Sequence, residues 1–189
     1  MLDSDSRLMN LMDYLQRRNL TKYLVLGFVV LFLILILQKL FLLVALVAMS
    51  LVISFFMGNY QMAKLIGIEL VTFTTVLAGF AFGPTAGIFV GLFLIITHLT
   101  IGHFAAGTYI MWVVPAYLAL GFLAGTLTGF DFATLGIYLA VGLNVFNLAL
   151  TFLTFPQNLG NYLPYSITNV IFNLILFSQF GPIAASLVK

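Results

Sequence analysis

Six polar and aromatic residues in the apolar part of the chain are suited to holding a small planar molecule. A carboxylate and several amides can bind the polar edge of such a molecule while an aromatic face stacks on its ring, so that a few converging groups fix its orientation. These residue types predict ligand binding without covalent chemistry. The six residues are Glu69, His98, Trp112, Asn144, Asn147 and Asn169.

The composition of the chain indicates an integral membrane protein. Of its 189 residues, 63% are hydrophobic and 6% are charged, which leaves too few polar residues to cover a soluble fold. Asp131 is the only charged residue between Glu69 and Lys189, so this stretch has no room for a soluble domain. The chain contains no cysteine, which excludes disulfides and thiolate metal sites.

The apolar segments predict an all-α membrane domain within residues 40–189, folded as a compact bundle of six transmembrane helices. Each segment is bounded by polar or helix-breaking residues. The predicted spans are 40–57, 67–82, 84–101, 108–128, 133–155 and 163–188.

The apolar run 23–37 leaves a second arrangement open. At about 1.5 Å per residue it would extend only about 22 Å, whereas the core of a bilayer is roughly 30 Å thick. Residues 23–39 therefore form either a lead-in to the next helix or a separate seventh span. Cytoplasmic flanks are enriched in Lys and Arg, and this favours six spans with both termini inside, because only Lys64 then lies outside.

Residues 1–22 differ from the rest because they carry most of the charged side chains of the chain. Leu8, Leu11, Met12 and Leu15 recur at helical spacing between these charges. The pattern predicts an N-terminal amphipathic helix that lies on the membrane surface. Its charged region is too long and too acidic for a cleaved signal peptide, so we expect it to stay attached.

In the six-span topology, the polar side chains of the spans gather in the outer halves, and the inner halves hold mainly small and aliphatic residues. Polar groups are costly to bury in hydrocarbon, so we expect them to face one another or a water-filled cavity. Together they predict an outward-facing pocket with a closed inner end. Besides the six residues named above, the outer halves hold Thr72, Thr74, Thr97, Thr100, Tyr109, Thr151, Tyr165, Thr168 and Asn173.

These residues also have simpler interpretations. Asn and Thr often join membrane helices by hydrogen bonds, and Trp112 and Tyr162 could belong to an interfacial aromatic belt. Glu69 could be a surface carboxylate near a helix N-terminus. His98 and His103 lie five positions apart, which fits one helical face poorly. With Glu69 they make only a weak metal set, and we predict neither a metal nor a cofactor.

Two series of glycines recur at every fourth position and form flat strips along helices, which indicates either tight helix packing or a surface for a partner helix. In the first series, proline follows a glycine. Since proline lacks an N–H and disfavours helical geometry in the preceding residue, the pair predicts a tight turn between two helices. The series are Gly79, Gly83, Gly87 and Gly91, with Pro84 at the turn, and Gly121, Gly125 and Gly129.

The segment IELVTFTTVLAGFAFGPTAGIFVGLF, with Gly83, Pro84 and Gly87 at its turn, resembles a block of the substrate-binding S components of energy-coupling factor (ECF) vitamin transporters. GTYIMWVVPAYLALGFLAG and YSITNVIFNLILF are similar in kind, and the resemblance covers roughly residues 40–188. It implies six helices and a vitamin-like molecule bound from outside. It also implies partners, namely a transmembrane coupling subunit and two cytoplasmic ATPases.

The chain departs from this family at the helix that docks the coupling subunit. The family pattern there is A-x-x-x-A, whereas here Ala45 is followed four positions later by Met49, and the nearest small pair is Ser50 with Ser54. The apolar segment 23–37 is a second departure. The chain also opens with Met-Leu instead of an N-terminal histidine, which disfavours a nickel- or cobalt-binding member.

We therefore expect a non-catalytic substrate-binding subunit in the cell membrane, with its N-terminus in the cytoplasm and no nucleic-acid partner. The sequence has no G-x-x-x-x-G-K-[ST] loop, so ATP hydrolysis would belong to other subunits. The main alternative is a structural membrane subunit that binds no solute. A lipid-modifying enzyme is disfavoured because H-E-x-x-H and G-x-S-x-G motifs are missing. The sequence does not distinguish thiamine-, flavin-, biotin- and deazapurine-like ligands.

Overall fold

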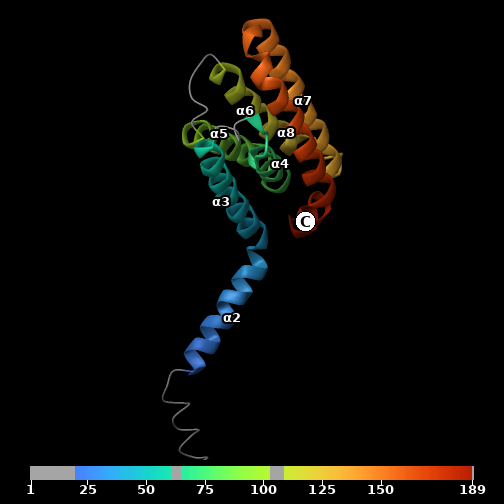
Figure 1. Ribbon diagram of the computed structural model, residues 1–189. Coiled ribbons are helices and arrows are strands. Elements are labelled where there is room, and N and C mark those ends of the chain that lie inside the picture. Colours follow the sequence, from blue (N-terminus) through green and yellow to red (C-terminus); the bar gives the residue numbers. More distant parts are fainter. Residues whose placement is uncertain (1–19, 61–64, 103–108, 189) are drawn as a thin grey trace, which may run out of the picture. The chain divides into compact units, whose positions relative to one another are not determined.

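The computed structural model describes residues 20–60, 65–102 and 109–188, and every regular element in these ranges is a helix (Figure 1). Most of the amphipathic segment predicted for residues 1–22 lies outside the described residues. The elements are α2 (Leu20–Ile36), α3 (Gln38–Asn59), α4 (Val71–Phe82), α5 (Pro84–Ile101), α6 (Ile110–Thr126), α7 (Phe132–Thr154), the 3-10 turn η2 (Pro156–Asn158), α8 (Leu159–Gln179) and α9 (Gly181–Val188).

Three of these helices, α3, α5 and α7, are long and apolar enough to cross a membrane. The pair α8 and α9 is a fourth candidate if it forms one broken span. The remaining helices of residues 40–189 are shorter, with 12 residues in α4 and 17 in α6. The all-helical prediction is therefore confirmed for the described residues, and three to four candidate spans are compatible with a membrane protein. The predicted count of six spans is not confirmed.

Two predicted spans differ from the observed helices. Residues 67–70 are not helical, so the segment predicted as 67–82 forms a helix only from Val71. The segment predicted as 163–188 begins earlier, at Leu159, and bends by 52° between α8 and α9. Pro182 explains this bend, because it lacks the N–H that would continue the hydrogen bonding of α8.

The chain divides into two compact units, Met1–Phe41 and Leu42–Lys189. In the first unit, residues 22–33 of α2 are all exposed, as expected for an apolar helix surrounded by lipid. Only Leu37 separates α2 from α3. Its N–H donates to Leu33 O (2.7 Å) and its carbonyl accepts from Phe41 N–H (2.9 Å), so backbone hydrogen bonding continues across the break.

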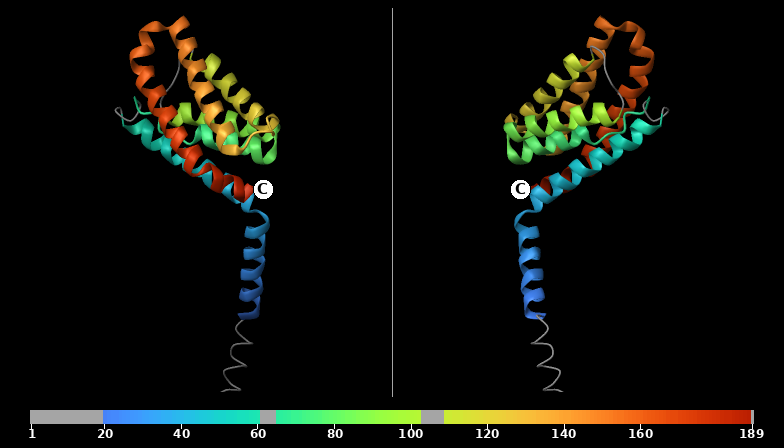
Figure 2. Two further views of the ribbon diagram at one scale, coloured as in Figure 1. Left: turned by 90° about the vertical axis from the view of Figure 1, so that its right-hand side faces the viewer. Right: turned by 90° about the vertical axis from the view of Figure 1, so that its left-hand side faces the viewer.

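The second unit contains two groups of packed helices (Figure 2). Helices α4, α5 and α6 pack against one another, and α7 lies alongside α8. Three phenylalanine rings fill the space where α4 meets α7 and α8. The ring centroids of Phe73 and Phe177 are 4.9 Å apart, and each lies 5.5 Å from the centroid of Phe132.

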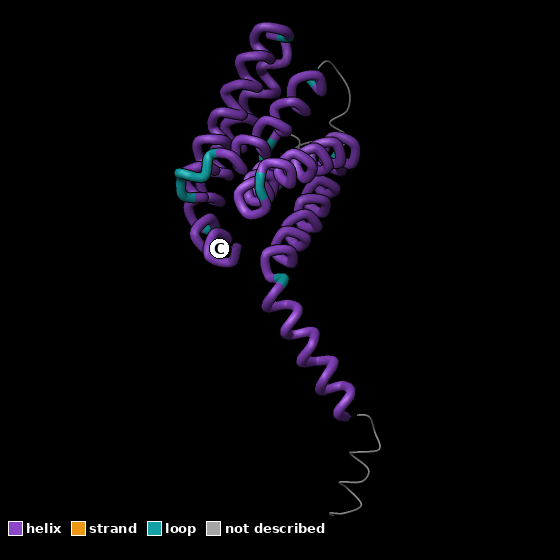
Figure 3. The backbone as a smooth tube through the Cα atoms, turned by 180° about the vertical axis from the view of Figure 1, so that it is seen from behind, coloured by secondary structure: helices purple, strands orange, loops and turns teal. Residues whose placement is uncertain are grey.

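A single residue, Gly83, makes the turn between α4 and α5. Figure 3 shows that helices make up most of the described backbone. Its φ of 91° lies in the region that favours glycine. The N–H of Gly83 donates to Gly79 O (2.9 Å), which closes α4. Pro84 is the first residue of α5, where an N–H has no helical partner and its absence costs little.

Close backbone packing joins α4, α5 and α6. A Cβ atom at Gly79 would lie 2.5 Å from the carbonyl oxygen of Gly121, and one at Gly121 would overlap the backbone of Gly87. These glycines of the two series therefore pack against each other inside the second unit and offer no free surface to a partner helix. The same holds for Gly91 against Thr75 and Tyr117, and for Gly125 against Pro84.

We expect Gly121→Ala to destabilise the protein by roughly 1–3 kcal/mol, because the added methyl group overlaps the backbone of α5. The measurement is the midpoint of thermal unfolding in lipid nanodiscs. Gly142→Ala is the matched control, since a Cβ atom at that position of α7 meets nothing within 4 Å. Equal midpoints for the two variants would contradict this packing.

Candidate functional site

A short non-helical segment, residues 67–70, places Glu69 between helices. The N–H of Gly67 donates to Thr168 Oγ1 (2.8 Å), and Asn169 Nδ2 donates to Gly67 O (2.8 Å), so α8 satisfies both backbone groups. A Cβ atom at Gly67 would overlap Asn169 and the carbonyl of Tyr165, and only glycine allows this approach. Irregular backbone within a membrane is tolerated where protein buries it and satisfies its polar groups in this way.

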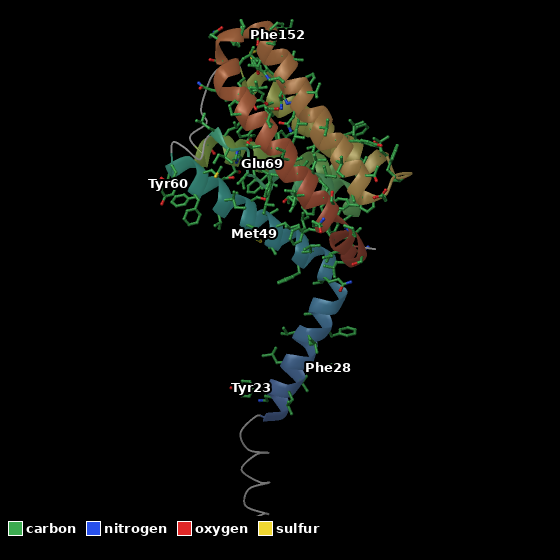
Figure 4. The ribbon with its side chains drawn as sticks, turned by 45° about the vertical axis from the view of Figure 1, so that its right-hand side comes forward. Tyr23, Phe28, Met49, Tyr60, Glu69 and Phe152 are labelled. Atoms are coloured by element: carbon green, nitrogen blue, oxygen red, sulfur yellow. The ribbon has the colours of Figure 1, made fainter. Side chains whose placement is uncertain are left out.

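Glu69 is buried, with 1% of its surface exposed. Its Oε2 accepts from the N–H of Thr72 (2.9 Å), and its Oε1 accepts from Thr72 Oγ1 (2.6 Å) and Asn169 Nδ2 (3.1 Å). Figure 4 shows Glu69 among the helices of the second unit, whereas Met49 and Phe152 lie on its outside. A buried carboxylate in a membrane protein marks a candidate functional site, because its burial is costly.

A chain of amides connects Glu69 to α7. Asn169 Oδ1 accepts from Asn144 Nδ2 (2.8 Å), which also donates to Ala140 O (2.9 Å). The carbonyls of Ala140 and Gly67 lie at the two ends of this chain and fix the orientation of both amides. Asn169 therefore presents its NH₂ group to Glu69. Ser166 Oγ donates to Asn144 Oδ1 (3.1 Å), so the amide oxygen of Asn144 also has a partner.

Hydroxyl groups extend the contacts of Glu69 to α6. The proton of Thr72 Oγ1 is donated to Glu69, so the hydroxyl of Tyr117, 3.0 Å away, must donate to Thr72. On the side of α8, the carbonyl of Tyr165 lies against Gly67, two residues before Glu69. Tyr117 thus contacts a hydrogen-bond partner of the carboxylate, and Tyr165 contacts the segment that carries it.

An aromatic cluster lies where α6 begins, α7 ends and α8 begins. It consists of Tyr109, Trp112, Phe155, Tyr162 and Tyr165. Tyr109 lies between Trp112 and Tyr162, with centroid distances of 5.7 and 5.8 Å, and Tyr162 stacks on Tyr165 at 5.9 Å. Trp112 stacks on Phe155 at 6.3 Å. Because the carbonyl of Tyr165 packs against Gly67, two residues before Glu69, the cluster lies next to the segment that carries the carboxylate.

Two buried polar atoms in or beside the aromatic cluster have no hydrogen-bond partner among the described residues. They are a donor, Trp112 Nε1, and an acceptor, Asn147 Oδ1; Asn173 Oδ1, in the residue that donates to Asn169, and Thr75 Oγ1 also have none. The side chain of Asn147 hydrogen-bonds to Tyr162, and Tyr162 hydrogen-bonds to Tyr109, which contacts Trp112. Since a buried unsatisfied group costs about 1–3 kcal/mol, such atoms indicate a place where a bound molecule or water completes the structure.

His98 lies on a second polar track, between α5 and α3. Ser54 Oγ donates to Ser50 O (2.7 Å), so His98 Nδ1, 2.8 Å from Ser54 Oγ, is the donor in that contact. Ser50 Oγ in turn lies 3.2 Å from Thr74 Oγ1. Ser50 and Ser54 therefore face the interior. His98 also interacts electrostatically with Glu69, which links this track to the candidate site.

The described residues contain no group of three or more His, Cys, Asp or Glu side chains that could hold a metal ion. His103, the other member of the weak metal set considered from the sequence, lies outside the described residues. The oxygen atoms of Glu69 are instead occupied by hydrogen-bond donors.

The structure brings together the six residues predicted from the sequence in three ways. Glu69, Asn144 and Asn169 share one hydrogen-bond chain, Asn147 and Trp112 adjoin or belong to the aromatic cluster, and His98 interacts with Glu69 from the serine track. Sequence reasoning did not select Tyr117, Ser166 or Phe155. A tyrosine in the middle of a span was the available signal for Tyr117, since a buried phenol needs a hydrogen-bond partner.

Comparisons with protein families, curated proteins and solved structures found no match to this chain.

We expect Asn169→Ala to lower stability by roughly 1–3 kcal/mol, because it removes the side-chain partner of Gly67 O and one hydrogen bond each from Glu69 and Asn144. The measurement is the thermal unfolding midpoint in nanodiscs. Asn161→Ala, at an exposed position of the same helix, is the control. It should change the free energy of unfolding by no more than about 0.5 kcal/mol, so that its midpoint stays close to that of the unchanged protein. A midpoint for Asn169→Ala no lower than that of the control would show that the amide chain is not needed for the fold.

Proposed function

We propose that this chain is a non-catalytic membrane subunit that binds a vitamin-like small molecule from the outer face for ATP-driven uptake. Coupling and ATPase functions belong to separate chains in this proposal. One observation supports it above all: the segment that carries a buried carboxylate packs against an aromatic cluster, and Trp112 Nε1 in that cluster and Asn147 Oδ1 beside it have no partner among the described residues. Carboxylate, amides and aromatic faces are the groups that bind a planar polar molecule.

The proposed topology has six spans, with the N-terminus in the cytoplasm and residues 23–39 as a lead-in. It places the loop after α3 outside. The start of α4, the end of α5, the starts of α6 and α8 and the end of α7 then share the outer side. Glu69, His98 and Trp112 lie at these outer ends, and Asn144, Asn147 and Asn169 lie from the middle of α7 and α8 outward, so the site would open toward the outside.

The proposed partners follow from the resemblance to ECF S components and from the missing ATP-binding loop in the sequence. Ser50 and Ser54, the nearest equivalent of the family's small-residue pair, hydrogen-bond toward Thr74 and His98 in the interior. A coupling subunit would therefore contact a different face.

Glycines of both series also pack inside, so they give little support to the alternative of a structural subunit.

The experiment is a thermal-unfolding screen of the protein in lipid nanodiscs against individual water-soluble vitamins and nucleobase-like compounds. We expect one compound to raise the midpoint, because a ligand at 100 times its Kd stabilises the folded state by about 2.7 kcal/mol. Glu69→Gln and Trp112→Ala should lose this shift and still unfold cooperatively. Asn161→Ala, the exposed control in α8, should keep it.

Two results would contradict the proposal. One is that no compound in the screen changes the midpoint. The other is that Glu69→Gln and Trp112→Ala both keep the full shift, because the ligand would then bind elsewhere.

A further inference from the structure

Two buried atoms at the aromatic cluster indicate which groups the edge of a ligand must carry. Trp112 Nε1 can only donate a hydrogen bond, and Asn147 Oδ1 can only accept one. The side chain of Asn147 also hydrogen-bonds to Tyr162, and since its oxygen has no partner among the described residues, its NH₂ group makes that contact. The side of this amide that is left for a ligand is therefore an acceptor.

A short series of contacts joins these two atoms. The ring of Trp112 packs against Tyr109, Tyr109 hydrogen-bonds to Tyr162, and Tyr162 hydrogen-bonds to Asn147. Trp112 also stacks on Phe155, which directly follows α7, the helix that carries Asn147. Both atoms thus belong to the region where α6 packs against α7, so one molecule bound there can bond to both.

We propose, resting on the proposed function, that the ligand is a planar heterocycle that contains a ring amide. Its carbonyl oxygen accepts from Trp112 Nε1, and its ring N–H donates to Asn147 Oδ1. Both groups of a ring amide lie in the plane of the ring, so the ring faces remain free to pack against the aromatic cluster. A site with a buried acceptor discriminates against an analogue that cannot donate to it, because the acceptor then stays without a partner.

Isothermal titration calorimetry in lipid nanodiscs tests the donor that Asn147 requires. Two pairs of compounds are used: theobromine with caffeine, and lumichrome with its doubly N-methylated derivative. In each pair, methylation removes the ring N–H of the amide and keeps the carbonyl oxygens; empty nanodiscs correct for partition into lipid. We expect the N–H compound of at least one pair to bind about tenfold more tightly than its methylated derivative.

Asn147→Leu distinguishes a hydrogen bond from a steric effect of the added methyl group. It removes Oδ1 and keeps a side chain of similar size, so the ratio of the two affinities should fall toward one. Asn161→Ala, the exposed control in α8, should keep the ratio. A cooperative thermal transition of Asn147→Leu in nanodiscs checks that this variant is folded.

The donor of Trp112 is tested on the unchanged protein. Trp112 is the only tryptophan of the chain, so an isotope-labelled indole gives a single N–H signal in an NMR spectrum. Binding of theobromine or lumichrome should move this signal downfield, because Nε1 then donates to a carbonyl oxygen. Trp112→Phe, which keeps a ring and loses the N–H, should weaken binding of both members of a pair by about three- to tenfold.

Equal affinities within both pairs would overturn the inference, as would a preference that survives Asn147→Leu or an indole signal that does not move downfield on binding. Failure of both theobromine and lumichrome to bind would overturn it as well. The proposed function would still stand if another vitamin gave a Glu69-dependent shift in the thermal screen. If that screen is also negative, both the proposed function and the ring-amide ligand are wrong.

Discussion

The hydrogen bonds of Asn169 are the interaction on which the candidate site depends. One amide group holds Gly67 O and Glu69 Oε1 through its NH₂ and accepts from Asn144 through its oxygen. These contacts join the segment before α4 to α8 and α7. They satisfy the buried carbonyl of Gly67, and together with the bonds from Thr72 they keep Glu69 in one position. The carboxylate is thus arranged before any ligand arrives.

The glycine packing of α4, α5 and α6 supports this arrangement from the other side. Backbones approach closely at Gly79, Gly87 and Gly121, and this sets how α4 and α6 lie next to each other. Tyr117 on α6 can then reach Thr72 on α4, which donates to Glu69. A larger residue at Gly121 would separate these helices, so packing far from Glu69 controls the geometry of its hydrogen bonds.

Composition and glycine spacing predicted the helical membrane class and the turn at Gly83, because both depend on local physics. The sequence also placed Glu69, Asn144 and Asn169 in the outer halves of their spans. It did not predict that these groups bond to one another, since the direction of a side chain around its helix depends on tertiary packing. The late start of α4 has the same cause: Thr168 and Asn169, distant in sequence, hold the backbone of Gly67 in a non-helical conformation.

Native mass spectrometry of the protein, purified gently from the membranes of its own host, tests the central claim most directly. The claim is that the Glu69 site holds a small molecule. The account predicts a discrete adduct of a few hundred daltons on the unchanged protein and on Asn161→Ala, and its loss from Glu69→Gln. An adduct that persists on Glu69→Gln, or a bare chain that still binds no compound when vitamins are added, would contradict the account.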